Sequence, residues 1–194
     1  MKVTLFGGSF NPIHYGHIGL AQWVIAHTDT DALWLMVSPN NPLKDRSVLA
    51  DEQERLSQVR QVIERLQAQE PNEINAKLYA SDFEFHLPQP SYTANTLRAL
   101  SQAYPQHTFR LLIGEDNWAN FRRWREWEYL LTHYEIWVYP RQSTKDQGIP
   151  TSAYRNTDIP RPLTPSNLEG ELWGHTVRYL WEAPRFDISS SEIR

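Results

Sequence analysis

The chain has 194 residues, a size that suits a single domain. It contains no cysteine, which excludes disulfide scaffolds, thiol nucleophiles and cysteine-based zinc or iron–sulfur sites. The net charge of −4 argues against general binding to a nucleic-acid backbone, and no apolar run approaches the roughly 20 residues needed to span a membrane. We therefore expect a cytoplasmic protein that binds neither nucleic acid nor membrane, and the sequence indicates no oligomeric state.

In the first half of the chain, short apolar runs alternate with amphipathic segments. The runs 2–6 and 32–37 predict buried strands, because they are apolar on both faces. Residues 16–27 predict a helix, and residues 51–69 predict a second one that starts at Asp51 as N-cap and ends before Pro71. Residues 76–83 predict a further strand.

The second half continues the alternation. We expect a helix at 93–104, a strand at 109–113, helical pieces within 118–133, and strands at 135–139 and 176–181. Residues 142–175 are polar and rich in proline, which predicts a long loop. Strands that alternate with helices indicate an α/β, doubly wound parallel sheet, here in one domain over residues 1–194.

The turn after the first strand has the composition of a phosphate site. Residues 7–17 read GGSFNPIHYGH, and the glycines allow a ligand to approach the backbone closely. The helix that follows offers unpaired N–H groups and the positive end of its dipole to an anion. His14 and His17 can donate hydrogen bonds to phosphate oxygens. A tight turn with two surface histidines is the plainer alternative, and a zinc site lacks a third ligand.

The end of the chain carries a second candidate anion site. Ser189 to Glu192 has the form of a capping box, in which serine hydroxyls and backbone N–H groups converge beside the cation of Arg194. An ordinary helix cap is the alternative. Two anion sites at opposite ends of the chain are what a nucleoside triphosphate would need.

Four segments together resemble one enzyme family. Residues 7–17 resemble the G-G-[ST]-F-[DN]-P-x-H-x-G-H signature of the nucleotidylyltransferase superfamily, and residues 188–194, ISSSEIR, resemble its I-S-S-T-x-I-R signature. Residues 90–97, PSYTANTL, resemble the S-Y-T-x-x-T-L segment of nicotinate-nucleotide adenylyltransferases. Residues 113–116, IGED, followed by Trp124, resemble the I-G-x-D…W segment of that family.

The resemblance implies a Rossmann-like nucleotidylyltransferase fold and a reaction. An enzyme of this kind transfers the AMP moiety of ATP to nicotinate mononucleotide, giving deamido-NAD and pyrophosphate in NAD biosynthesis. Its substrates are small molecules, and Mg²⁺ is expected on the ATP phosphates rather than on a protein metal site.

The resemblance also implies a role for individual residues. His14, His17 and Arg194 are expected to be catalytic, with His17 the main contact to the transition state. ATP is expected to contact Gly7, Gly8, Ser9, Phe10, Gly114, Asp116, Ser189, Ser190 and Arg194. The mononucleotide is expected to contact Lys44, Tyr92, Thr93 and Trp124, with Trp124 stacked on the pyridine ring. Asn11 and Arg141 are further candidates near the same cleft.

Two departures from the family pattern and three alternatives remain. Position 11 is asparagine where many members have aspartate, and the chain ends at Arg194, so we expect the C-terminal helix to be cut short. The nearest alternative reaction uses nicotinamide mononucleotide. Pantetheine-phosphate or cytidylyl transfer fits less well, because those enzymes lack the Ser-Tyr-Thr segment and the tryptophan. A catalytically inactive nucleotide-binding relative is the alternative outside enzymes.

Overall fold

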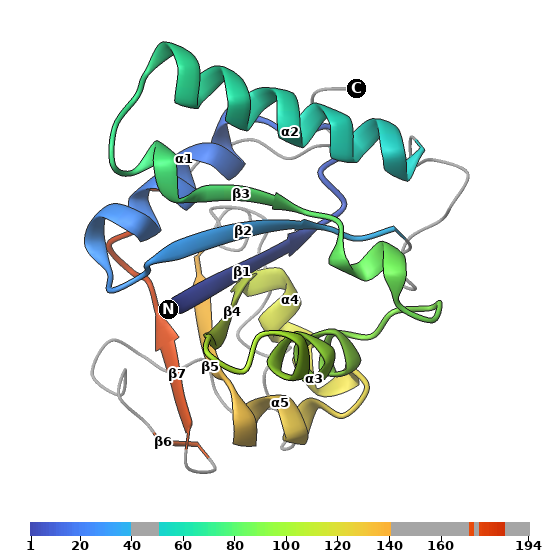
Figure 1. Ribbon diagram of the computed structural model, residues 1–194. Coiled ribbons are helices and arrows are strands. Elements are labelled where there is room, and N and C mark those ends of the chain that lie inside the picture. Colours follow the sequence, from blue (N-terminus) through green and yellow to red (C-terminus); the bar gives the residue numbers. More distant parts are fainter. Residues whose placement is uncertain (40–50, 141–170, 173–174, 185–194) are drawn as a thin grey trace, which may run out of the picture.

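The computed structural model describes residues 1–39, 51–140, 171–172 and 175–184. A seven-stranded sheet runs through the described residues in the order β3-β2-β1-β4-β5-β7-β6 (Figure 1). All neighbouring strands are parallel except β6, which pairs antiparallel with β7. The strands are β1 (Lys2–Gly8), β2 (Ala32–Val37), β3 (Leu78–Ser81), β4 (Thr108–Gly114), β5 (Glu135–Tyr139), β6 (Glu171–Leu172) and β7 (His175–Tyr179).

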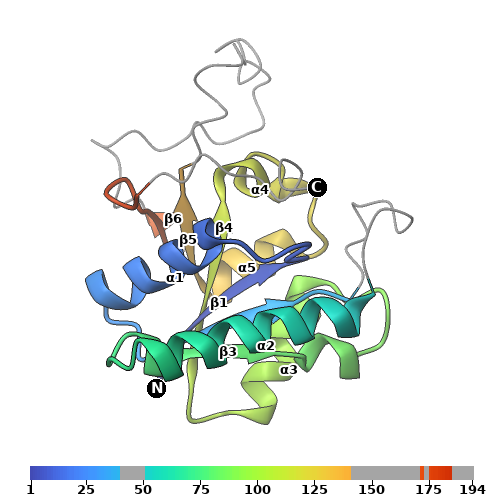
Figure 2. The ribbon, with the colours of Figure 1, turned by 90° about the horizontal axis from the view of Figure 1, so that it is seen from above.

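Helices cover both faces of the sheet, as Figures 1 and 2 show. One face packs against α1 (Tyr15–His27) and α2 (Glu52–Gln69), and the other against α3 (Thr93–Ala103) and α5 (Trp127–His133). The short α4 (Glu115–Ala119) follows β4. Three 3₁₀ turns complete the described elements: η2 (Asn75–Lys77), η3 (Phe83–His86) and η4 (Phe121–Arg123). The prediction of an α/β doubly wound sheet is confirmed.

The buried strands explain the near-continuous apolar runs of the sequence. In β1, Val3 and Leu5 pack into the core beneath α3 and α5, while Phe6 packs into the core beneath α1 and α2. Because side chains of a strand alternate between its faces, a strand covered on both sides is largely apolar. Two separate cores, one on each face, therefore hold the central sheet.

Capping sets the start of α2. The Asp51 carboxylate accepts hydrogen bonds from the backbone N–H groups of Gln53, at 2.9 Å, and Glu54, at 3.3 Å. These contacts satisfy donors that the first turn of a helix leaves without intrahelical partners. The predicted N-cap is confirmed.

Some element bounds differ from the predictions. The strand expected over 76–83 is shorter, because only Leu78–Ser81 pairs with β2 and both flanks wind into 3₁₀ turns. The short strand β6 lies inside the stretch 142–175 that was expected to be a loop. The rest of that stretch up to residue 174 lies outside the described residues, so the single-domain division remains a prediction. No helix in the described part combines the length and apolarity needed to cross a membrane.

The sheet order creates a crevice. From β1 the chain builds outward through β2 and β3, and then crosses to β4 on the other side of β1. At this point the loops after two neighbouring parallel strands run in opposite directions and leave a gap between them. Ligands of such folds bind in this gap, beyond the carboxyl ends of the strands.

Candidate active site

The loop between β1 and α1 buries the aromatic ring of its own Phe10. Phe10 is only 1% exposed and adopts φ 43°, a backbone conformation that L-residues seldom take. Its ring lies so close to Gly8 that a Cβ at position 8 would stand 3.0 Å from the ring. A residue with a Cβ at position 8 would therefore need the buried ring to shift by a few tenths of an ångström. Ser9 and Asn11 are also buried, so Ser9, Phe10 and Asn11 can reach a ligand chiefly through the backbone.

The two histidines of the signature stand together where α1 begins. Their rings stack with centroids 3.6 Å apart, and the His14 backbone N–H donates to His17 Nδ1 at 3.3 Å. Because Nδ1 accepts this bond, the neutral His17 ring carries its proton on Nε2. The His17 ring also packs edge-on against Phe10 at 5.1 Å. Stacking, packing and the hydrogen bond thus fix both orientation and tautomer.

A pocket of about 250 Å³ opens beside this loop, on the α3 side of the sheet. Gly7 and Gly8 line it, and so do Tyr92, Thr93 and Trp124. The structure therefore brings together five of the predicted site residues from three separate segments. The other lining residues are Leu5, Met36, Ser38, Glu84, Ser91, Thr96, Leu97, Leu111, Ile113, Asn117, Arg123 and Arg125.

The start of α3 faces the pocket with Tyr92 as its N-cap and Thr93 as its first residue. The Tyr92 side chain makes no capping hydrogen bond, and its ring lies beneath the Arg125 guanidinium at 4.9 Å. The first N–H groups of a helix carry partial positive charge and favour an anion. Arg123 and Arg125 also line the pocket, so two cations lie near this helix start.

Trp124 also lines the pocket. Its ring packs against Phe121 at 5.2 Å, while its indole Nε1 is buried and has no hydrogen-bond partner among the described residues. The tryptophan thereby combines a fixed aromatic face with a buried donor at the pocket wall.

The predicted adenosine-side residues lie at the carboxyl end of β4, outside the lining of the pocket. Gly114 is the N-cap of α4, and the Asp116 side chain folds back over it so closely that a Cβ at position 114 would collide with the carboxylate. Gly114 and Asp116 thus share the carboxyl edge of the sheet with the β1–α1 loop, because β1 and β4 are parallel neighbours.

Two buried charges belong to the site region and were not predicted. Glu84 lines the pocket, and burial raises the pKa of its carboxyl, although hydrogen bonds from Thr96, Ser38 and Ser91 oppose that rise. Arg55 of α2 is buried behind the β1–α1 loop, and the loss of hydration lowers the pKa of its guanidinium. Both had a signal in the sequence. Arg55 stands four residues before Val59 of the apolar stripe of α2, and Glu84 stands between two phenylalanines.

Five predicted site residues lie outside the described residues: Lys44, Arg141, Ser189, Ser190 and Arg194. Their predicted roles are neither supported nor opposed by the geometry. Among the residues that the structure does describe, no group of three or more histidine, aspartate or glutamate side chains could hold a metal ion.

Comparison with known proteins gives a consistent result. The model of the cytidylyltransferase-like family matches residues 5–194. A curated Flavobacterium johnsoniae protein, named as a probable nicotinate-nucleotide adenylyltransferase, is 37% identical over all of this chain and 85% of its own length. A Bacteroides fragilis protein of the same name is 44% identical over all of this chain and 80% of its own length.

Solved structures share the fold at lower identity. The Plasmodium falciparum nicotinic acid mononucleotide adenylyltransferase complexed with NaAD aligns with 98% of this chain and 81% of that chain. The TM-score is 0.70 and the sequence identity 20%. The same enzyme complexed with APC gives a TM-score of 0.67 at 19% identity. These likenesses support the fold.

Proposed function

This chain belongs to the cytidylyltransferase-like family and, within it, to the nicotinate-nucleotide adenylyltransferases, and from that membership we propose that it transfers the adenylyl group of ATP to nicotinate mononucleotide. The observation that carries the proposal is the pocket. It brings Tyr92, Thr93 and Trp124 to the side of the glycine-rich turn that leads into the two histidines.

The chemistry needs alignment more than acid–base catalysis. An oxygen of the mononucleotide 5′-phosphate attacks the α-phosphorus of ATP, a new P–O bond forms, and the bond to the β-phosphate breaks to release pyrophosphate. The attacking oxygen is already ionised near neutral pH, so no protein group has to remove a proton. The protein must hold the two phosphates in line and stabilise the charge that develops on them.

On the ATP side, the β1–α1 loop supplies the donors. The His17 ring, with its proton on Nε2, can donate to a phosphate oxygen, and His14 stacks on it in a fixed orientation. Gly7 and Gly8 allow close approach of the nucleotide. We assign stabilisation of the transition state to His17, and contacts on the adenosine side to Gly114 and Asp116.

On the mononucleotide side, the helix start and the two arginines that line the pocket favour the acid over the amide. The start of α3 and the cations of Arg123 and Arg125 suit a carboxylate, while Trp124 offers a flat face for the pyridine ring. A neutral carboxamide would gain less from the same donors. The site therefore supports nicotinate mononucleotide as substrate.

The remaining assignments stay predictions. Lys44 is assigned to the mononucleotide phosphate, and Ser189, Ser190 and Arg194 to the triphosphate; Asn11 and Arg141 remain candidates. We propose that Mg²⁺ arrives with ATP, bound by phosphate oxygens, where it would neutralise charge on the leaving pyrophosphate. The cytoplasmic location also remains a prediction.

The test compares two substrates. Initial rates of pyrophosphate release are measured with ATP, Mg²⁺ and either nicotinate or nicotinamide mononucleotide, and the dinucleotide product is identified by chromatography. We expect kcat/KM for the acid to exceed that for the amide by at least about 100-fold, because the amide leaves buried donors unpaired. Preference for the amide would contradict the substrate assignment. Absence of pyrophosphate release with both would favour an inactive nucleotide-binding relative.

A further inference from the structure

A buried arginine joins two loop ends at the carboxyl edge of the sheet. The Arg55 side chain leaves the first turn of α2 and is 1% exposed. Its Nη1 donates to the carbonyl oxygens of Ser9, at 2.5 Å, and Ser38, at 2.9 Å, and its Nη2 donates to that of Pro39 at 3.2 Å. Ser9 lies in the β1–α1 loop and Ser38 follows β2. One guanidinium therefore fixes the separation of two loops.

A buried glutamate holds the next part of the site in the same way. Glu84 of η3 is 8% exposed, and its carboxylate accepts hydrogen bonds from Thr96 Oγ1 at 2.8 Å and Ser91 Oγ at 3.4 Å. The Ser38 hydroxyl also bonds to this carboxylate. Thr96 belongs to the first turn of α3 and Ser91 immediately precedes the Tyr92 N-cap. Glu84 thus sets the position of the pocket wall at the start of α3.

Ser38 connects the two charges. Its carbonyl accepts from Arg55, its hydroxyl bonds to Glu84, and its backbone N–H donates to the Gly8 carbonyl at 2.9 Å. A continuous path of hydrogen bonds therefore runs from Ser9, through Arg55, Ser38 and Glu84, to the start of α3. We call the three central residues the Arg55–Ser38–Glu84 bridge.

Burial of these two charges is costly, since each loses its hydration and neither lies in a close ion pair with the other. Their contacts include backbone carbonyls and hydroxyls that border the cleft. A buried charge-assisted hydrogen bond holds such groups more firmly in place. In-line attack is sensitive to placement, because a displacement of about 1 Å can cost about 100-fold in rate.

We propose that Arg55 and Glu84, joined through Ser38, are positioning residues that fix the β1–α1 loop relative to the pocket wall at the start of α3. This inference rests on the proposed function, because it takes the loop to hold ATP and the wall to hold the mononucleotide. The bridge sets the position of the two substrates relative to each other, while other residues largely bind each substrate.

The kinetic test uses Arg55→Met and Glu84→Gln. We expect kcat to fall by about 100-fold in R55M and about 10-fold in E84Q, while KM for each substrate changes by less than about fivefold, because alignment is lost and binding is kept. Since both act through Ser38, the double variant should lose little more than R55M alone. The proposal would be overturned if the two single losses of kcat multiplied in the double variant, or if the variants changed only KM.

A matched control exists in the same two regions. Arg60 of α2 pairs with Asp82, which immediately precedes η3, at 2.8 Å on the surface. Arg60→Met removes a link between the same two segments without touching the cleft, so kcat should stay within about twofold of the parent value. Thermal unfolding is measured for every variant, and kinetic constants are compared at a temperature where all are folded.

A readout without turnover separates this proposal from the proposed function. Hydrogen exchange is measured on the unliganded protein at the backbone amides of residues 9–11. E84Q lies at the end of the bridge away from residues 9–11, and it should still speed their exchange several-fold. R60M should leave the exchange unchanged. If the parent protein shows no adenylyl transfer, the proposed function fails and this measurement alone decides the bridge. Unchanged exchange at 9–11 in E84Q would overturn it.

Discussion

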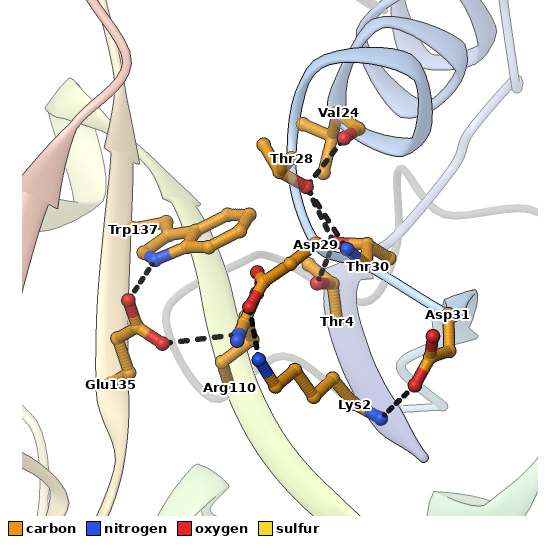
Figure 3. A network of polar contacts seen from close by, with 10 residues as sticks. All are labelled: Lys2, Thr4, Val24, Thr28, Asp29, Thr30, Asp31, Arg110, Glu135 and Trp137. Atoms are coloured by element: carbon orange, nitrogen blue, oxygen red, sulfur yellow. Dashed lines mark hydrogen bonds and ion pairs between the residues drawn. The ribbon is translucent and has the colours of Figure 1, made fainter.

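The two ends of the central sheet each bury an arginine, and the two arginines have different surroundings. At the carboxyl edge, Arg55 donates to three backbone carbonyls of loops that border the cleft. At the amino edge, Arg110 of β4 is 5% exposed and pairs with two carboxylates, Asp29 at 2.6 Å and Glu135 at 3.1 Å (Figure 3).

The residues around Arg110 at the amino edge also contact one another. The Arg110 guanidinium also lies 4.3 Å from the centre of the Trp137 ring, and the Trp137 indole donates to Glu135 at 2.7 Å (Figure 3). Asp29 in turn pairs with Lys2. The partners of Arg110 are two carboxylates and the Trp137 ring, and none of them lines the pocket. We infer that the amino edge serves stability, while the carboxyl edge holds groups in place for chemistry.

Substitution of His17 gives the largest expected effect and tests the carboxyl edge. In His17→Ala we expect kcat to fall by about 100- to 1,000-fold, because a donor to the transition state is lost. Thermal unfolding should change little. His27→Ala, at the other end of α1, removes a ring stacked on Trp23 and its hydrogen bond to the Trp23 carbonyl, and should keep parental turnover. Near-normal turnover in H17A would contradict the assigned role.

Substitution of Arg110 tests the amino edge. Arg110→Met should cost about 2–3 kcal/mol of unfolding free energy, because two carboxylates lose a buried partner. We expect kcat per folded molecule to stay near the parent value. Urea unfolding and steady-state kinetics measure the two quantities. Arg178→Met serves as control, since this exposed arginine lies 5.4 Å from the same Trp137 ring. A large loss of kcat in R110M would remove the distinction between the edges.

Substitution of Trp124 sharpens the division within the carboxyl edge. Trp124→Leu keeps an apolar side chain but removes the stacking face, so KM for the mononucleotide should rise about 10-fold. KM for ATP should change by less than about twofold. Trp118→Leu is the control, because Trp118 packs on the same Phe121 at 5.1 Å and does not line the pocket. Equal effects of the two variants would show a packing role for Trp124.

Substitution of Asp29 gives the smallest effect and depends on pH. Hydrogen bonds from Arg110, and then from Lys2, hold the pKa of Asp29 well below its ordinary value of 3.8. Its stabilisation is therefore complete at neutral pH and is lost as pH falls below 3.8. Because the carboxylate is half exposed, Asp29→Asn should cost about 0.5–1 kcal/mol at pH 7.

The D29N substitution is measured by urea unfolding at pH 7 and pH 3, with R110M as the second background. The difference between parent and variant should shrink at the lower pH and also in R110M, where the main partner is missing. A cost that stays constant with pH would contradict the ion-pair origin.

The sequence predicted the framework well for a physical reason. The strands at 32–37 and 135–139 were predicted with the bounds that the structure shows, because burial on both faces makes most of each strand apolar. The length of the strand at 78–81 was overestimated, since only the part that pairs with β2 forms a strand. That is a tertiary property which local pattern cannot report.

The site was predicted in part. Tyr92, Thr93 and Trp124 came from resemblance to a family, and the structure brings them to one pocket from distant segments. Arg55 and Glu84 were missed, because an arginine in a polar helix and an acid near a turn usually face solvent. Their apolar neighbours gave a local signal, but burial also depends on contacts with distant segments, such as those of Arg55 with Ser9 and Ser38.

The contact between Gly8 and Phe10 has an evolutionary consequence. A side chain at position 8 would push the ring of residue 10, and that ring also supports Phe6 at 5.8 Å and His17 at 5.1 Å. A mutation at one of the two positions is therefore expected to displace the His17 ring. A larger residue at position 8 combined with a smaller side chain at position 10 could restore its placement. Positions 8 and 10 should therefore show epistasis, and paired changes should be accepted more often in mutational libraries than single ones.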